Sequence, residues 1–298
     1  SAYRNAVAFK RIDRVDAFHV VTRYDWVSGT VYDQYDDSLD LSDDKKYYVM
    51  TDEFNLYKCI SNNNAVKSTT KPTHTEPEIK AVGNDGYRWK FMYSLTSSET
   101  LNFMSTDFIH VSTDSTVSAA AVDGALDTIL VVAGGSSFNT SSGSTISAIP
   151  IRGDGSGGVA SVTISSGAIT AATVTTAGSG YTFAYIRDAD IIAATNAGGA
   201  GSGSNLNVII PPKGGHGSNA VKELGGFFVM LNKSLVGVEG TSDIGVGNDF
   251  RRIGLVRDPT NFGGSTVATA TTRRQLYAIK FASVSGTFTA DEEINQAS

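Results

Sequence analysis

The histidines and the single cysteine are the side chains of this chain best suited to metal binding or nucleophilic catalysis. His19, His74, His110 and His216 lie in unrelated contexts, without the His-x-x-x-His or neighbouring Glu spacing of a helical zinc site. Cys59 lies in the strand-like run LYKCIS, which favours a buried thiol over a nucleophile. The sequence therefore predicts no catalytic residue, no metal site and no cofactor.

The glycine-rich and acidic segments also lack a complete catalytic or ligand-binding motif. Gly153–Gly158 has no following Lys-Ser/Thr of a phosphate loop, and Gly201–Ser204 is no nucleophile elbow between a strand and a helix. The Arg-Gly-Asp tripeptide at 152–154 is interpreted as chance. The acidic run 33–44 has neither Gly at position six nor Glu at position twelve of a calcium loop. It favours a solvated loop or a charged docking surface, while a spatially paired glycosidase dyad stays open.

Two further segments are unusual for a plain scaffold. Pro211–Gly217 (PPKGGHG) places three glycines and a histidine after two prolines, and Asn248–Pro259 (NDFRRIGLVRDP) has three arginines around an apolar centre. Arginine pairs bidentately with carboxylates and is enriched at protein interfaces. Two interpretations remain equal, a subunit contact and an internal network at a domain corner. The candidate residues are Gly214, Gly215, His216, Asn248, Asp249, Phe250, Arg251, Arg252, Arg257 and Asp258.

The composition limits the class of protein. The 298 residues allow one large or two ordinary domains, and no apolar run is long enough to span a membrane. No signal peptide is expected from the opening residues, and the lone cysteine indicates a reducing compartment. The net charge of −6 argues against nucleic-acid binding. With 31 glycines and 18% charged residues, the chain suits a turn-rich β protein.

The low charge is confined to one part of the chain. Residues 119–211 hold seven of the 54 charged residues but 15 of the 31 glycines. We therefore predict that 119–211 is an inserted Gly/Ser-rich β module, and that 1–118 and 212–298 form one discontinuous domain.

The flanks read mainly as strands. Gly86–Leu95 alternates aromatic and polar residues, which predicts a half-buried strand with its aromatic side chains on one face. A capping box from Thr96 to Glu99 predicts a helix over 97–104, while the first 20 residues stay open between strand and helix. Further strands are expected at Tyr47–Met50, Leu56–Ile60, Phe227–Leu231 and around Tyr277, Ile279 and Phe281.

The insert carries a degenerate repeat. Thr128–Phe138 and Ala172–Tyr181 each have a β-prone run, then Ala-Gly, small residues and an aromatic residue. β-rich runs follow them at Val159–Ile164 and Leu206–Ile210, and Ser166-Gly167 predicts a hairpin turn. The whole chain is thus predicted to be mainly β, a two-domain β-sandwich-like protein with few short helices.

Six segments, in the same order along the chain, resemble the baseplate wedge protein family of T4-like contractile-tailed bacteriophages. The family member that they resemble is the dimeric wedge subunit. They are RYDWVSGTVYDQYDDSLDL (23–41), YYVMTDEFNLYKCISNNN (47–64), STTKPT (68–73), DGYRWKFMYSL (85–95), PPKGGHG with the following ELGG (211–226) and NDFRRIGLVRDP (248–259). The resemblance covers most of the two flanks; the insert matches less distinctively.

The resemblance implies a structural virion protein and no enzyme. It implies a homodimer in the phage tail baseplate that contacts other wedge subunits, and a late protein that assembles in the bacterial cytoplasm. No small-molecule substrate, cofactor or membrane comes with the family. The implied role is baseplate assembly and relay of the host-contact signal to sheath contraction. The alternative is a carbohydrate-binding or hydrolysing tail protein that uses the inserted module.

Overall fold

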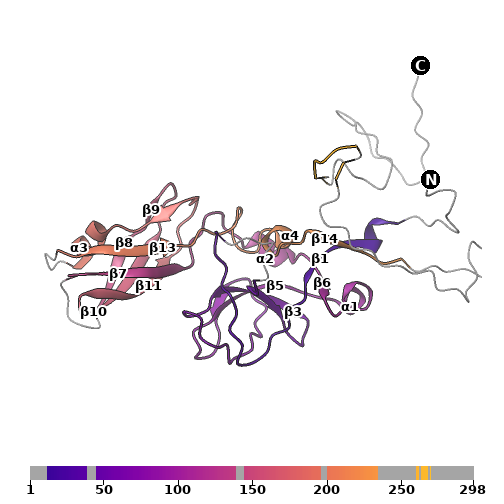
Figure 1. Cartoon of the computed structure of the whole chain (residues 1–298), viewed down its shortest axis with the longest axis horizontal. Coiled ribbons are helices and arrows are strands. Elements are labelled where there is room, and N and C mark those ends of the chain that lie inside the picture. The colour runs from indigo at the N-terminus through magenta and orange to yellow at the C-terminus, as the bar shows by residue number, and fades with distance from the viewer. Residues whose placement is uncertain are drawn as a thin grey trace, which may run out of the picture.

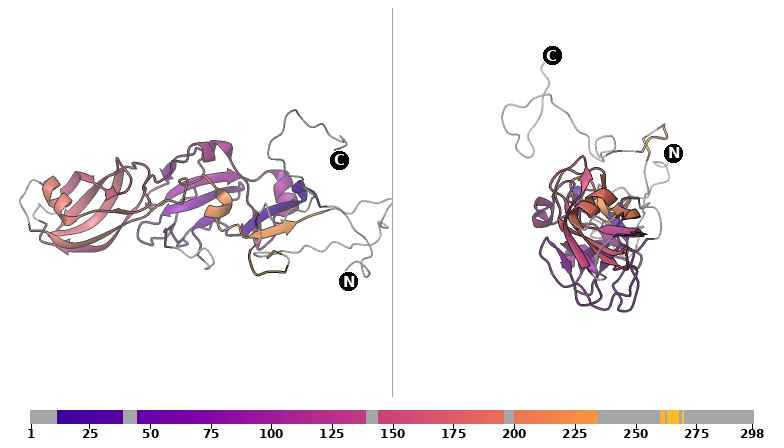
Figure 2. Two further views of the ribbon diagram at one scale, coloured as in Figure 1. Left: turned by 90° about the horizontal axis from the view of Figure 1, so that it is seen from above. Right: turned by 90° about the vertical axis from the view of Figure 1, so that its left-hand side faces the viewer.

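The computed structural model describes residues 12–38, 45–138, 144–195 and 200–233, together with 260–261, 263–267 and 269. The chain is mainly β, with several antiparallel sheets and few short helices, which confirms the predicted fold class. None of the helices in these ranges is long and apolar enough to cross a membrane. Figures 1 and 2 show an elongated molecule, with the strands of the insert at one end and two sheets of the flanks beyond them.

The elements follow one another from a 3-10 turn η2 (Arg14–Asp16) to strand β14. The flank strands are β1 (Ala17–Thr22), β2 (Tyr48–Met50), β3 (Asn55–Ser61), β4 (Ile79–Ala81), β5 (Arg88–Ser94), β6 (Phe108–His110) and β14 (Phe228–Leu231). The insert strands are β7 (Ile129–Ser136), β8 (Ser144–Pro150), β9 (Arg152–Gly153), β10 (Val159–Ser165), β11 (Ala168–Thr176), β12 (Ala184–Tyr185) and β13 (Ser202–Val208). The helices are α1 (Ser97–Phe103), α2 (Ser115–Ala119), α3 (Asp188–Thr195) and α4 (Ala220–Glu223).

The central sheet of the flanks has the antiparallel order β2-β3-β5-β4. Its core on one face is aromatic: Trp89 opposes Cys59 in register and stacks on Tyr87 with ring centroids 5.4 Å apart. The expected burial of the Cys59 thiol is confirmed, and burial raises its pKa well above the ordinary value. The strands expected at Tyr47–Met50 and Leu56–Ile60 are β2 and β3.

The prediction that β5 is half-buried is wrong. Its aromatic residues are buried but do not share one face: Trp89 and Phe91 lie in one core cluster, whereas Tyr93 lies in another with Met92, after a register shift in the pairing with β3. Lys90 and Met92 on the alternate positions are buried too. Met92 packs with Ala220 and Leu224, so α4 covers the second face of the strand. A local alternation cannot show this cover, because α4 lies more than a hundred residues further along the chain.

The second flank sheet has the order β14-β1-β6 and joins the two ends of the described flanks. Val20 pairs with both Phe228 and His110, so β1, left open by the sequence, is the central strand. Helix α1 begins at the predicted capping box, where the Glu99 N–H donates to Thr96 Oγ1 over 3.3 Å and the Thr96 N–H donates to Glu99 Oε2 over 2.7 Å.

The insert combines three antiparallel sheets, β11-β10-β8, β13-β7 and β12-β9. Ser166 and Gly167 join β10 to β11 with φ of 52° and 78°, the two left-handed residues of the predicted hairpin turn. The first repeat copy forms β7 and the second forms β11, but β13 begins four residues before the expected run and ends two before its end.

The aromatic residues that close the two repeat copies both lie in the core of the insert. Phe138 and Tyr181 are buried, and the Tyr181 hydroxyl accepts from the Gly158 N–H and donates to the Ile151 carbonyl, each over 3.0 Å. This core takes all of its buried members from residues 126–208. The predicted strand around Tyr277–Phe281 lies outside the described residues, as do Asp40, Asp43 and Asp44 of the acidic run.

Candidate functional site at the junction of insert and flanks

The loop at 211–217 lies where the insert joins the flanks. Gly215 has φ of +87°, and its N–H donates to the Pro212 carbonyl over 2.7 Å. A Cβ on Gly215 would lie 2.2 Å from the Val122 carbonyl oxygen, so only glycine fits against the start of the insert. The neighbouring Gly214 N–H donates to Asp123 Oδ1 over 2.6 Å. The loop thus contacts the insert directly through its backbone.

His216, the next residue of this loop, enters a buried cluster of charged side chains. Lys58 Nζ on β3 donates to His216 Nδ1 over 3.0 Å and to Glu223 Oε2 over 2.8 Å. The Lys58 and Glu223 side chains are 0% and 1% exposed. Lys58 Nζ also lies 3.9 Å from the centroid of the Tyr35 ring. The cluster therefore links the central sheet, the 211–217 loop and helix α4 through almost fully buried side chains.

The backbone around Glu223 is shaped to hold its carboxylate. The Gly217 N–H donates to Oε1 over 2.8 Å and to Oε2 over 3.0 Å, and the Asn219 N–H donates to Oε1 over 3.1 Å. The Asn219 side chain caps α4 by accepting from the Lys222 N–H. The Tyr47 hydroxyl donates to the Glu223 carbonyl over 3.0 Å. Such a buried carboxylate needs these partners, because an unpaired buried charge is costly.

Burial makes the charged forms of both bases in the cluster less favourable. Burial lowers the pKa of the Lys58 amine, although the nearby Glu223 carboxylate raises it. Burial also holds the pKa of His216 well below its ordinary value, and the positive charges of Lys58 and Lys90 lower it further. Neutral His216 accepts a hydrogen bond from Lys58 Nζ at Nδ1 and therefore carries its own hydrogen on Nε2. Nε2 lies 3.9 Å from Asp127 Oδ2.

A second layer of charges lies toward the insert. Arg88 on β5 donates through Nη1 to the Asp127 carbonyl over 2.6 Å, and its Nη2 lies 3.8 Å from Asp127 Oδ1. Burial raises the pKa of the Asp127 carboxyl against the lowering effect of Arg88. Lys90 donates to the Pro77 carbonyl. The first residues of the insert thus continue the polar network that begins at Lys58.

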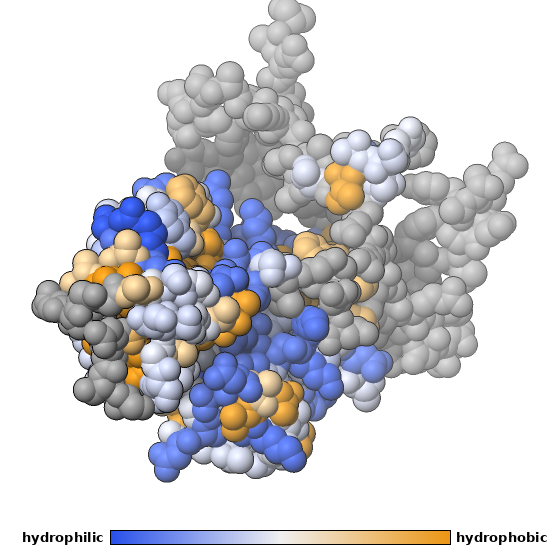
Figure 3. All heavy atoms as spheres, turned by 60° about the vertical axis from the view of Figure 1, so that its left-hand side comes forward, coloured by the Kyte–Doolittle hydropathy of each residue, from blue (hydrophilic) through white to orange (hydrophobic). Residues whose placement is uncertain are grey.

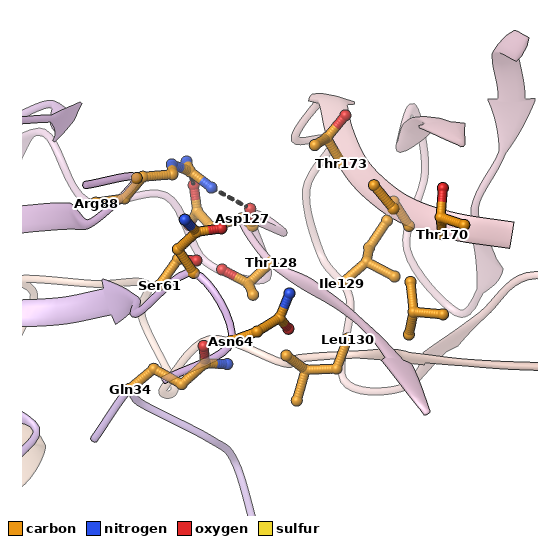
Figure 4. Close-up of a pocket in the computed structure, with 15 residues that line it drawn as sticks. Gln34, Ser61, Asn64, Arg88, Asp127, Thr128, Ile129, Leu130, Thr170 and Thr173 are labelled. Carbon is orange, nitrogen blue, oxygen red and sulfur yellow. Dashed lines mark hydrogen bonds and ion pairs between the residues drawn. The ribbon is translucent and has the colours of Figure 1, made fainter. Parts of the chain in front are cut away.

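A cleft of about 450 Å³ opens beside this network, between the central sheet and the insert. Figure 4 shows Gln34, Ser61 and Asn64 on the flank side and Ile129, Leu130 and Thr170 on the insert side, with the Arg88–Asp127 pair at one end. The lining combines hydroxyl and amide groups with aliphatic side chains. Its charged lining residues are Arg88 and Asp127, which pair with each other.

The charged side chains of the Arg-Gly-Asp tripeptide form their contacts within the insert. Arg152 of the Arg-Gly-Asp tripeptide pairs with Asp190 over 2.8 Å, and Asp154 accepts from the Thr182 N–H over 2.9 Å. These two charged groups therefore support the local fold, which agrees with the interpretation of the motif as chance. Among the described residues, no group of three or more His, Cys, Asp and Glu side chains could hold a metal ion.

Three of the ten candidate residues, Gly214, Gly215 and His216, come together at this junction. The structure does not test the interpretation of these residues as a subunit contact. The other seven lie outside the described residues: Asn248, Asp249, Phe250, Arg251, Arg252, Arg257 and Asp258.

Sequence reasoning missed the two central members of the cluster, Lys58 and Glu223. Lys58 follows the apolar LY of a strand, and a lysine between buried residues is a signal that a partner lies nearby. Glu223 offers no local signal, because its burial depends on a sheet 165 residues away.

Comparison with known proteins gave no relative. No family model, curated protein or solved structure matches this chain.

Proposed function

We propose that this chain is a structural subunit of the baseplate wedge of a contractile-tailed bacteriophage. The observation that carries the proposal is the ordered likeness of six flank segments to the T4-like wedge family. In this role the protein forms a homodimer, contacts other wedge subunits and helps relay the host-contact signal to the sheath. Such a relay requires subunit contacts whose free energies differ between the two states of the tail.

The junction described above supports a mechanical role. A buried hydrogen-bonded cluster and a close-packed glycine loop join the central sheet to the insert. Such a junction can transmit a displacement, which a flexible linker would not. The insert and the two flank sheets follow one another along the long axis of the molecule (Figure 2). This arrangement suits a component that spans neighbouring subunits. On the face shown in Figure 3, hydrophobic residues form small separate groups among hydrophilic ones.

The proposal places the chain in the virion after assembly in the host cytoplasm. The test is quantitative mass spectrometry of purified tails from a phage that encodes this chain. We expect the protein in tails, and in the baseplate fraction after disassembly, at a fixed ratio to known wedge subunits. Its absence from purified tails would refute the proposal.

The carbohydrate alternative has one observation in its favour. Of the four aromatic residues in the insert, Phe183 and Tyr185 are 54% and 45% exposed, whereas Phe138 and Tyr181 are buried. Neither exposed ring lines the cleft beside Asp127. A glycan array probed with the full chain tests this function: specific binding that Phe183→Ala abolishes would favour it over the structural role.

A further inference from the structure

The Lys58–Glu223 contact joins an amine and a carboxyl group in a site closed to water. Nζ and Oε2 are 2.8 Å apart, and both side chains are essentially inaccessible. The aromatic ring of Tyr35 covers Nζ at 3.9 Å. Exclusion of water protects the intermediate of a condensation from hydrolysis and strengthens the electrostatic interactions around it. Burial also lowers the pKa of Lys58, so the nucleophilic neutral amine is more accessible than at the surface.

The carboxyl group of Glu223 is held as an acyl group would be in an acyl-transfer site. Two backbone N–H groups, from Gly217 at 2.8 Å and Asn219 at 3.1 Å, point at Oε1. This pair matches the geometry of an oxyanion hole, which stabilises the negative oxygen of a tetrahedral intermediate. Oε2, the oxygen nearer the amine, also accepts from the Gly217 N–H over 3.0 Å and is the one placed to leave.

His216 is positioned to carry a proton between the two reacting groups. Its Nδ1 lies 3.0 Å from Lys58 Nζ and 4.0 Å from Glu223 Oε2. An unprotonated ring nitrogen at hydrogen-bond distance from an attacking amine is the arrangement of a general base. The same nitrogen can then return the proton to the leaving oxygen.

We propose that Lys58 and Glu223 condense spontaneously to an isopeptide bond between Nζ and Cδ, a modification that covalently links β3 to the C-terminal end of α4. The lysine ammonium first transfers a proton to Oε2, which gives a neutral amine and a carboxylic acid. Nζ then attacks Cδ, and the negative charge develops on Oε1 between the Gly217 and Asn219 N–H groups. His216 moves a second proton from Nζ to Oε2, the Cδ–Oε2 bond breaks, and one water leaves.

The products are one amide and one water, so no oxidant, reductant or cofactor is needed. The amide replaces two opposite charges in a dry site, where each charge carries a large desolvation cost. It makes a closed covalent loop of the chain between residues 58 and 223, which includes the whole insert. The reaction occurs once per molecule, so it is a maturation step and not an enzymatic turnover.

The chain offers an internal control in another close amine–carboxylate pair. Lys71 Nζ lies 2.5 Å from Asp52 Oδ1, but the Asp52 side chain is 78% exposed. The described structure places no histidine at this pair and no backbone N–H pair on its carboxylate. If proximity were sufficient, a bond would form at both pairs. If burial, the histidine and the backbone N–H pair are also needed, a bond forms only at Lys58.

The experiment is mass spectrometry of the purified full chain after denaturation. We expect an intact mass about 18 Da below the sequence mass, the loss of one water. A tryptic digest should contain peptide 47–67 linked to peptide 223–233, because a linked Lys58 is not cut. No link should join 68–80 to any peptide that contains Asp52, the product expected for Lys71 and Asp52. Lys58→Arg should return the protein to its sequence mass, and His216→Gln should slow the loss of water at least tenfold.

Two results would overturn the proposal. One is wild-type protein that keeps its full sequence mass after prolonged incubation in the folded state at neutral pH. The other is a mass deficit whose linked peptides do not include Lys58 and Glu223. Both readings use the wild-type chain, so the test stands even if the Lys58→Arg variant does not fold.

Discussion

The packing of the junction loop leads to a quantitative prediction for two glycines with similar positive φ. Gly215 has φ of +87° and Gly29 has φ of +84°. A Cβ at Gly29 would meet no described atom within 4 Å, whereas one at Gly215 would lie 2.2 Å from the Val122 carbonyl oxygen. The two alanine variants therefore share the cost of a left-handed conformation and differ only in the close contact with the insert.

The expected cost follows from these two contributions. Gly29→Ala should lower the free energy of unfolding by about 1–2 kcal/mol, the left-handed penalty of a residue with a Cβ. Gly215→Ala carries the same penalty and also forces the Val122 backbone away, which adds about 1–3 kcal/mol by analogy with overpacking. The difference between the variants measures how tightly the loop and the insert are packed.

Urea unfolding followed by tryptophan fluorescence is a suitable assay, because both tryptophans lie in the flanks, where Trp26 packs against the core cluster of Trp89. Small-angle scattering of the folded variants reports whether the insert has moved relative to the flanks. Equal destabilisation by Gly29→Ala and Gly215→Ala, with unchanged scattering, would refute the account of a close-packed junction.

Three further predictions concern the buried His216, the core of the insert and the packing of helix α1. Because the pKa of His216 is depressed, the folded state binds fewer protons than the unfolded state below about pH 6.5, and the protein loses stability as the pH falls. His216→Gln should remove up to about 1.4 kcal/mol of that loss per pH unit. Urea unfolding between pH 7 and 5 measures the difference. Tyr181→Phe removes both hydrogen bonds of a buried hydroxyl and should lower the stability of the insert by about 1–3 kcal/mol, measured by hydrogen exchange. The control Phe183→Ser, at an exposed position, should change that stability by less than about 0.5 kcal/mol. Phe103→Ala should cost about 3–5 kcal/mol in thermal unfolding, while Leu101→Ala, at a position 83% exposed, should leave the midpoint nearly unchanged; equal effects would contradict the assigned packing of α1.

Local patterns were sufficient for the elements whose stability is local. The Thr96–Glu99 capping box fixes the start of α1, and the Ser166-Gly167 pair fixes the β10–β11 turn, because both depend on contacts within a few residues. The aromatic alternation around Trp89 likewise identified β5 and the burial of its aromatic residues, but not the register shift that places Tyr93 in a different core cluster from Trp89.

Features that depend on contacts between distant residues could not be predicted from local sequence patterns. Met92 is buried in a cluster with Ala220 and Leu224, and Lys90 is buried beside Gly217, where it donates to the Pro77 carbonyl. The alternation alone reads both residues as exposed. The Lys58–Glu223 pair likewise depends on a contact between β3 and α4 across the insert, and no spacing rule connects residues so far apart. The glycines and His216 of the junction loop were noticed only because their composition is unusual, without any indication of their partners.

A reconstruction of the intact tail at side-chain resolution, from a phage that encodes this chain, tests the central claim most directly. The account predicts two copies of this β-rich chain in contact within each baseplate wedge, with the Gly215 loop packed on the insert in each copy. A tail whose baseplate contains no density for this chain would contradict the account.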